Sequence, residues 1–353
     1  MIKRAEFTMS GRERMQALFN REPLDYVTYV HRGYSFCANN AGVAKADIYD
    51  DPQKSFDAQM WTNEQYNSDG SPFYTFVSYG AWEFGGTIEW PDDRWGSGPG
   101  VEKVPIESPE QLWDLELPDV KTAGSVPKMM EFAKLQEAAG LPIGFVCGSP
   151  FTHAANLCGI NEFMMWIVEN PDAVHKAMRL MTDHILQVAD YFVDTFGKGN
   201  VIARSAAPTE SLIGPKQFEE FVKPYVTELH SKVLDKGAKY VYCHICGEQN
   251  HLLDQWAEVP FGERSVLSFG HEVPLEKAAE YFPDHIIAGN TDPQIIAQGH
   301  PDEVREALKQ TIETGKKLKN GYIFMGGCSL PASTPPYKVF MMSKAREEFG
   351  RFD

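Results

Sequence analysis

A histidine and a cysteine that could bind a metal ion stand two residues apart in the stretch KYVYCHICG, residues 239–247. Its β-prone residues predict a short buried strand, and Gly247 predicts a turn at its end. Because side chains two apart on a strand share one face, His244 and Cys246 are expected to point the same way, with Cys243 on the opposite face. An imidazole and a thiol are half of a tetrahedral zinc site.

The same residues allow two other interpretations. His244 and Cys246 can simply pack side by side in a hydrophobic core. Cys243 and Cys246 have the Cys-x-x-Cys spacing of a redox dithiol, but strand parity places their sulfurs on opposite faces, and redox pairs favour the N-terminus of a helix. A third soft ligand from elsewhere in the chain is therefore needed to favour the metal.

Composition narrows the class of protein. The 353 residues, with 43% hydrophobic and 23% charged side chains, are typical of a soluble globular protein. The net charge of −16 argues against nucleic acid as a partner, because phosphates require a basic face. No apolar run reaches the roughly 18–20 residues that cross a membrane, and the first residues lack the apolar segment of a secretory signal. With six cysteines and no such signal, a cytoplasmic protein without disulfides is expected.

Strand and helix patterns alternate along most of the chain, and they must position the candidate ligands. Strands are predicted at residues 27–30, 73–77, 143–147, 201–204, 240–245, 265–269, 285–289 and 321–325. Helices are predicted at 52–66, 126–138, 161–168, 171–196, 215–236, 248–257, 275–281, 301–316 and 336–349, after an N-terminal helical extension around 10–19. This alternation predicts an α/β fold, a (β/α)8 TIM barrel that forms a single domain over residues 1–353, with an irregular excursion at about 87–120.

The functional residues of such a barrel lie at the C-terminal ends of its strands. Cys328 follows the last predicted strand, after Gly326 and Gly327, so we expect the narrow lumen to bring it to His244 and Cys246. Three protein ligands with an open fourth position are typical of a catalytic zinc site rather than of a closed structural one.

Other strand ends supply further candidates. The fourth zinc position is expected to hold water or one of the side chains of Cys147, Glu83 and Glu272. Trp82, Glu83 and Asn290 are predicted to bind the substrate, because they follow predicted strands at the same end of the barrel.

Several segments, in order along most of the chain, resemble the motifs of one family. Residues 12–25, RERMQALFNREPLD, are similar to its opening helix, and residues 149–152, SPFT, to its Gly-Pro-Phe-Thr turn. Residues 289–293, GNTDP, and 327–336, GCSLPASTPP, are similar to its Gly-Asn-x-Asp-Pro segment and C-terminal motif. The chain thus resembles the uroporphyrinogen decarboxylase superfamily, which implies a (β/α)8 barrel.

Within that superfamily, a His-x-Cys followed much later by a Cys looks like the zinc site of the corrinoid-dependent methyltransferases. The decarboxylases carry an arginine-rich Arg-Gln-Ala-Gly-Arg-Tyr segment after the first strand, where residues 31–34 here read HRGY. The resemblance therefore implies a zinc-dependent methyltransferase rather than a tetrapyrrole decarboxylase. No Asp-x-His-x-x-Gly motif is present, so the corrinoid is expected on a separate protein that docks over the barrel mouth. A homodimer is also compatible with the resemblance.

The small molecule is predicted from the aromatic residues between Trp61 and Trp95, which favour a methoxylated aromatic compound and O-demethylation. The alternative is a methylcobamide:coenzyme M methyltransferase, in which Arg32 or Arg204 would bind the sulfonate. Two further alternatives are a uroporphyrinogen decarboxylase and a non-enzymatic barrel that zinc only stabilises.

Overall fold

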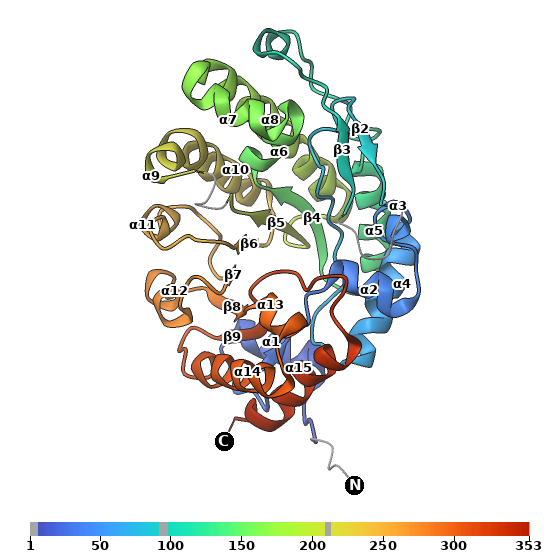
Figure 1. Ribbon diagram of the computed structural model, residues 1–353, viewed down its shortest axis with the longest axis vertical. Helices are drawn as coiled ribbons and strands as arrows, with labels where there is room; N and C mark the ends of the chain where they lie inside the picture. Colours follow the sequence, from blue (N-terminus) through green and yellow to red (C-terminus); the bar gives the residue numbers. More distant parts are fainter. Residues whose placement is uncertain (1–5, 92–97, 209–212, 353) are drawn as a thin grey trace.

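The computed structural model of the protein describes residues 6–91, 98–208 and 213–352. Its centre is a sheet of seven parallel strands in the order β1-β9-β8-β7-β6-β5-β4, with helices around the outside (Figure 1). The strands are β1 (Thr28–Tyr29), β4 (Ile143–Gly148), β5 (Val201–Ala206), β6 (Val241–Ile245), β7 (Val266–Phe269), β8 (Ile286–Thr291) and β9 (Tyr322–Gly326). This arrangement confirms the predicted α/β barrel.

One predicted strand is wrong, because residues 73–77 form no strand. The segment before them still lies against both edges of the sheet. The backbone N–H of Asp69 donates to Tyr29 of β1, and the side chain of Gln136 contacts both Pro72 and the N–H of Gly144 in β4. The segment therefore fills the place between β4 and β1 that an eighth strand would occupy.

Side chains replace the missing strand ladder in this segment. The amide of Gln59 donates to the carbonyl of Phe73 at 3.0 Å and accepts from the Phe73 N–H at 3.0 Å. Pro72 has no N–H group to offer a neighbouring strand. Because buried backbone groups must find partners, these glutamine contacts keep the segment in place without β-pairing.

Helices cover the outside of the sheet. They are α2 (Tyr34–Ala41), α3 (Lys45–Asp50), α4 (Pro52–Gln65), α5 (Val126–Ala138), α6 (Pro150–Cys158), α7 (Ile160–Glu169), α8 (Pro171–Phe196), α9 (Pro215–Gln217), α10 (Lys223–Lys236), α11 (Leu253–Trp256), α12 (Leu275–Tyr281), α13 (Pro293–Gln298), α14 (Pro301–Gly315) and α15 (Pro336–Phe349).

Two helix predictions need correction. The helix predicted at 215–236 is interrupted by a π-helical turn, Phe218–Val222, just before Pro224, whose missing N–H cannot continue the regular ladder. The helix predicted at 248–257 shortens to α11. Helices α2, α3, α6 and α13 are short and were not predicted.

The predicted excursion at 87–120 contains a small antiparallel hairpin of β2 (Thr87–Glu89) and β3 (Gly100–Lys103), followed by a 3₁₀ helix at Pro109–Trp113. Among the described residues, no helix combines the length and the apolar character that a membrane crossing requires.

The predicted N-terminal helical extension is α1 (Gly11–Asn20), and it closes the N-terminal end of the barrel. Ser10 caps the helix by accepting from the N–H of Glu13, while the Glu13 carboxylate accepts from the N–H of Ser10. Leu18 packs in one cluster with residues of β7, β8 and β9, and Phe19 lies against Tyr240 with ring centroids 5.1 Å apart. This end of the lumen is therefore a floor made by α1.

Candidate metal centre and its cavity

The structure brings the three predicted zinc ligands together at the C-terminal end of the barrel. His244 lies in β6, Cys246 follows that strand, and Cys328 follows β9. Their ligand atoms all lie within 4.8 Å of one another. The turn before Cys328 requires glycine, because a Cβ on Gly327 would lie 2.8 Å from the backbone nitrogen of His271.

The imidazole of His244 is oriented for metal binding. Its Nδ1 lies 2.7 Å from the hydroxyl of Ser268 in β7, so Ser268 fixes the ring. Its Nε2 lies on the side of Cys328, is buried and has no hydrogen-bond partner. A buried nitrogen without a partner is costly unless something binds it. A zinc ion held by His244, Cys246 and Cys328 fits this donor set, since one imidazole and two thiolates are common zinc ligands.

The electrostatics of the cluster favour the forms that bind metal. Burial lowers the pKa of His244, and the charge of Arg32 lowers it further, so the imidazole is neutral near pH 7. The hydrogen bond between the two thiols lowers the pKa of Cys328 well below its usual range and raises the pKa of Cys246. The thiol pair therefore holds one negative charge readily, next to the guanidinium of Arg32.

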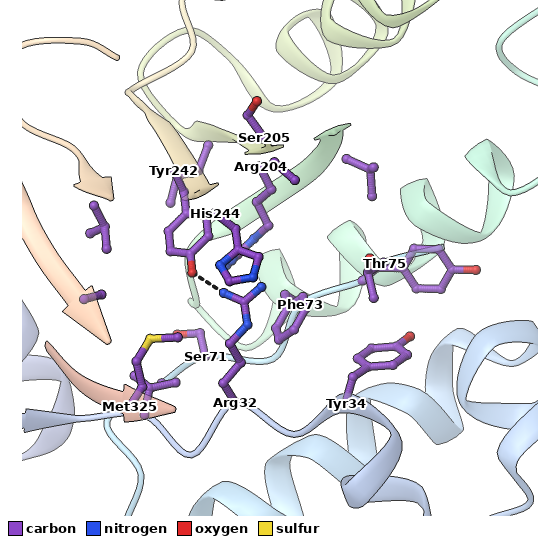
Figure 2. Close-up of a pocket in the computed structure, with 18 of the residues that line it drawn as sticks. Arg32, Tyr34, Ser71, Phe73, Thr75, Arg204, Ser205, Tyr242, His244 and Met325 are labelled. Atoms are coloured by element: carbon purple, nitrogen blue, oxygen red, sulfur yellow. Dashed lines mark hydrogen bonds between the residues drawn. The ribbon is translucent and has the colours of Figure 1, made fainter. Parts of the chain in front are cut away.

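Below the cluster lies a cavity of about 450 Å³ that extends down the lumen toward Met15 and Phe19 of α1. Figure 2 shows Arg32 and Arg204 entering it from opposite sides, close to His244 and Tyr242. No aspartate or glutamate is found among the described residues that line this cavity. Neither arginine forms an ion pair within the described part of the chain, although the whole sequence carries a net charge of −16.

Aromatic rings surround these two guanidinium groups. Arg204 lies over the ring of Phe73 at 5.2 Å and over that of Tyr242 at 5.6 Å, and burial lowers its pKa. Arg32 donates from Nη1 to the Tyr242 hydroxyl at 2.5 Å, and its Nε is buried without a partner. Two half-buried guanidinium groups without a carboxylate partner are well suited to bind an anion.

The predicted substrate-binding residues do not line this cavity. Glu83 is buried elsewhere, where its carboxylate accepts from the N–H of Gly80 and from the N–H and hydroxyl of Ser125. Trp82 packs against the rings of Phe76 and Trp90. These contacts occupy both side chains in packing and hydrogen bonding that belong to the outer loops.

Asn290 lies nearer the cluster but is engaged in structure. Its amide donates to the carbonyls of Gly270 at 3.1 Å and Val273 at 2.7 Å, which ties the end of β8 to the loop after β7. Of the aromatic residues in the predicted region, Trp61 is 63% exposed on α4, while Trp95 lies outside the described residues. The aromatic residues of this region that do line the cavity include Phe73, Tyr74 and Phe76, and Tyr34 of α2 lines it from outside the region.

The three side chains predicted as candidates for the fourth ligand differ in their positions relative to the cluster. Cys147 lies on the opposite face of its strand, beside Cys243, and both thiols are fully buried there. This position of Cys243 confirms the strand parity predicted from the sequence. The carboxylate of Glu83 is engaged by Gly80 and Ser125 and is not part of the cluster. Glu272 remains, since its charge acts on Cys246 and its Oε2 atom is buried without a hydrogen-bond partner.

Sequence reasoning missed two residues that complete the site, Tyr242 and Ser268. Tyr242 stands two residues before His244 on β6, so the same parity that paired His244 with Cys246 places it on the lumen face. Ser268 is the neighbour of His244 in the register between β6 and β7. That register was not available from the sequence.

Comparison with known proteins places this geometry in a family. Residues 10–349 match the family model described as uroporphyrinogen decarboxylase (URO-D). The chain belongs to the uroporphyrinogen decarboxylase family. A solved methyltransferase from Methanosarcina mazei superposes on 98% of this chain and 99% of that one, with a TM-score of 0.78 and 22% identity. This likeness shows the fold.

The characterised relatives of this family member fall into two groups. The methylcobamide:CoM methyltransferase MtaA of Methanosarcina barkeri is 22% identical over 255 residues, which are 71% of this chain and 72% of that protein. A methylated-thiol–coenzyme M methyltransferase of Methanosarcina mazei is 26% identical over 58% of this chain and 55% of its own length. Human uroporphyrinogen decarboxylase is 22% identical over 62% of this chain and 61% of its own length.

Proposed function

We propose that the protein is a zinc-dependent methyltransferase that moves a methyl group between a small molecule and the cobalt of a separate corrinoid protein. The observation that carries the proposal is the cluster of His244, Cys246 and Cys328, with an unpaired imidazole nitrogen at the open end of the barrel. The names of two relatives, which act on coenzyme M, support the same chemistry.

The decarboxylase alternative explains less of the site. Porphyrin carboxylates need an array of basic groups, and residues 31–34 supply one arginine where the decarboxylase motif has two. Decarboxylation also gives no role to two thiols and an imidazole that converge on one point. The metal cluster therefore favours methyl transfer within the family.

Two groups of residues would act on opposite ends of the ligand, one through a metal ion and the other through its acid group. His244, Cys246 and Cys328 would hold zinc, with Glu272 or water at the fourth position. Bound zinc supplies Lewis acidity that favours the ionised form of a thiol or of a leaving oxygen at neutral pH. Arg32 and Arg204 would hold an acid group in the cavity, which orients the ligand with its reactive atom toward the metal. The corrinoid protein would dock over the barrel mouth.

The favoured small molecule is a short thiol with an acid group, such as 2-mercaptoethanesulfonate (coenzyme M). The two arginines without carboxylate partners support the acid group, and the cavity of about 450 Å³ suits a small ligand. The sequence-based preference for a methoxylated aromatic compound rested on the aromatic residues between Trp61 and Trp95, and of these Phe73, Tyr74 and Phe76 line the cavity while Trp82 does not. A methoxylated aromatic acid stays the second candidate, because Tyr34, Phe73 and Tyr242 line the cavity beside the arginines.

The visible spectrum of a corrinoid tests the proposal. Zinc-loaded protein is mixed with methylcobalamin and 2-mercaptoethanesulfonate, and we expect the spectrum to change as the methyl group leaves cobalt. In the reverse arrangement, reduced cobalamin is mixed with 4-methoxybenzoate, and methylation of cobalt would support the second candidate instead. The matched control is the Cys246→Ser, Cys328→Ser double variant, which should bind no zinc and give no change. The proposal is contradicted if the folded, zinc-loaded protein changes the spectrum in neither experiment, and if replacing the free cobalamin with a corrinoid protein also gives no change.

A further inference from the structure

A chain of hydrogen bonds connects the arginine side of the cavity to the metal side. Arg32 Nη1 lies 2.5 Å from the Tyr242 hydroxyl, which lies 2.9 Å from the Ser268 hydroxyl. The Ser268 hydroxyl lies 2.7 Å from His244 Nδ1. Tyr242 and His244 sit on β6 and Ser268 on β7, so the relay is built on rigid strands rather than on loops.

Two arrangements of protons satisfy these distances and also give the fully buried Ser268 hydroxyl an acceptor. Its one further side-chain contact among the described residues is Arg32, which carries only donors, so Ser268 cannot accept from both Tyr242 and Nδ1 without leaving its own hydrogen unpaired. In the first, Tyr242 donates to Ser268 and Ser268 donates to Nδ1, which leaves the proton of the neutral imidazole on Nε2. A protonated Nε2 has no lone pair for a metal. In the second, Nδ1 donates to Ser268 and Ser268 donates to Tyr242, which leaves Nε2 free to ligate. Metal binding at His244 is compatible only with the second arrangement.

The second arrangement changes what Tyr242 can do. Arg32 carries only donors, so the Tyr242 oxygen then accepts from both Arg32 and Ser268. Its own O–H bond must point elsewhere, and its hydroxyl borders the cavity beside Arg32 and Arg204 (Figure 2). We infer that loading the metal reverses the relay through Ser268 and turns the Tyr242 hydroxyl into a donor for the acid group of the ligand.

Metal and anion then bind cooperatively through Tyr242 and Ser268, which are positioning residues for the proposed reaction. By linkage, the metal must tighten the anion by the same factor by which the anion tightens the metal. A hydrogen bond to a charged group corresponds to a factor of roughly ten or more in affinity, so we expect coupling of about tenfold. This inference rests on the metal site and the acid-bearing ligand of the proposed function.

The test is a binding measurement without turnover. Methanesulfonate serves as the anion probe, because it has no thiol that could ligate zinc. Its dissociation constant is measured by calorimetry on zinc-loaded and on zinc-free protein, and we expect the zinc-loaded protein to bind about tenfold more tightly. Competition against a chelator should show the reciprocal tightening of zinc by methanesulfonate, a measurement that needs no variant.

Two variants are expected to remove the coupling in opposite ways. Tyr242→Phe should weaken methanesulfonate binding in the zinc-loaded protein to about the zinc-free level, because the donor is gone. Ser268→Ala should strengthen it in the zinc-free protein to about the zinc-loaded level, because Tyr242 is then free in both states. If the coupling came only from direct electrostatic attraction between zinc and the anion, neither variant would change it.

Tyr240→Phe is the matched control, since Tyr240 lies two residues before Tyr242 and lines the same cavity but forms no hydrogen bond with the described residues of the relay. It should keep the wild-type coupling, and Ser268→Thr, which keeps a hydroxyl, should keep it too. Equal methanesulfonate affinity with and without zinc overturns the inference, as does a zinc dependence that survives Ser268→Ala. Either result, with zinc bound and corrinoid chemistry intact, would leave the proposed function standing, whereas a protein that binds no zinc refutes both.

Discussion

Two pairs of arginines lie inside this barrel, one fully buried and one half-buried, and they differ in their partners. At the floor, Arg14 of α1 bonds Asp25 and Asp69 at 2.7 Å each, and Arg346 of α15 bonds Asp69 at 2.9 Å. In the cavity, Arg32 and Arg204 have no carboxylate partner among the described residues.

The difference separates charges that stabilise the fold from charges that are available to a ligand. A buried charge is tolerated when it is paired, and the first pair joins α1, α15 and the segment after α4 through its own counter-ions. The second pair is half-buried and has no carboxylate partner among the described residues, so it is available to an anion. The presence of counter-ions therefore distinguishes the arginines that stabilise the fold from those that could bind a ligand.

Removing the shared carboxylate at the floor should have the largest effect. Asp69→Asn leaves Arg14 and Arg346 short of negative charge in a place where their side chains are 2% and 1% exposed. We expect the free energy of unfolding to fall by roughly 3 to 5 kcal/mol, measured by urea denaturation. Asp302→Asn, at a side chain that is 96% exposed, is the control and should change little. A loss below about 1 kcal/mol for Asp69→Asn would remove the basis of the comparison.

Removing a cavity arginine should weaken ligand binding instead of the fold. For Arg32→Met and for Arg204→Met, we expect methanesulfonate affinity to fall by roughly 1.5 to 3 kcal/mol in calorimetry, because a charged hydrogen-bond donor is lost. The free energy of unfolding should change little, since these half-buried side chains form no ion pair with the described residues. Arg14→Met is the matched counterpart and should destabilise the fold. Cavity variants that destabilise as much as Arg14→Met would show that the two pairs do not differ.

Acid should weaken the floor in a defined pH range. Burial raises the pKa of Asp25, but hydrogen bonds from Arg14 and from the N–H of Met9 outweigh it and lower the pKa from its ordinary 3.8 to about 2. Because the folded value lies below the unfolded one, this contribution is present above about pH 4 and is lost as the pH falls through about 2. It amounts to roughly 2 kcal/mol.

The Asp25→Asn variant tests this acid sensitivity. It should lower the free energy of unfolding by about 2 kcal/mol at pH 5, and the difference from wild type should shrink as the pH falls toward 2. Urea denaturation at a series of pH values measures both. A difference that stays constant from pH 5 to pH 2 would mean that Asp25 stabilises the fold by packing and not by charge.

Cys243 should give the smallest effect, and it checks which side chains face the lumen. Its thiol is fully buried on the outer face of β6, so Cys243→Ala is expected to cost about 1 kcal/mol and to leave one zinc per chain by elemental analysis. Cys246→Ala, three residues later, should lose the metal. Loss of zinc in the Cys243 variant would show that the metal binds on the opposite face of β6 from the one we assign.

The metal cluster was predictable from the sequence because it depends mainly on local strand patterns. Period-two alternation on β6 is enough to place His244 and Cys246 together, and the position of Cys328 after the last strand brings it to the same end of the barrel. The unpaired state of Arg32 and Arg204 was not predictable in this way. It is a property of what surrounds them, and their neighbours come from segments far apart in the chain.

The missing eighth strand has a similar cause. Residues 73–77 have strand-like composition, but whether a segment joins a ladder depends on partners that the local sequence does not contain. Here the side chains of Gln59 and Gln136 satisfy the backbone around Pro72 and Phe73 first. Trp82 and Glu83 were misplaced as a result, because their prediction assumed that they followed a strand at the barrel mouth.

Because α1 closes the N-terminal end of the barrel, mutations in this helix could change the length of the cavity. Met15 and Phe19 border the far end of the cavity, on a helix outside the repeating strand–helix units. Smaller or larger residues at these two positions would lengthen or shorten the space available to a ligand while His244, Cys246 and Cys328 stay unchanged. Mutations in the first twenty residues could therefore change the size of ligand that fits the cavity without altering the metal cluster. A change of substrate would then require no change at the reactive end of the site.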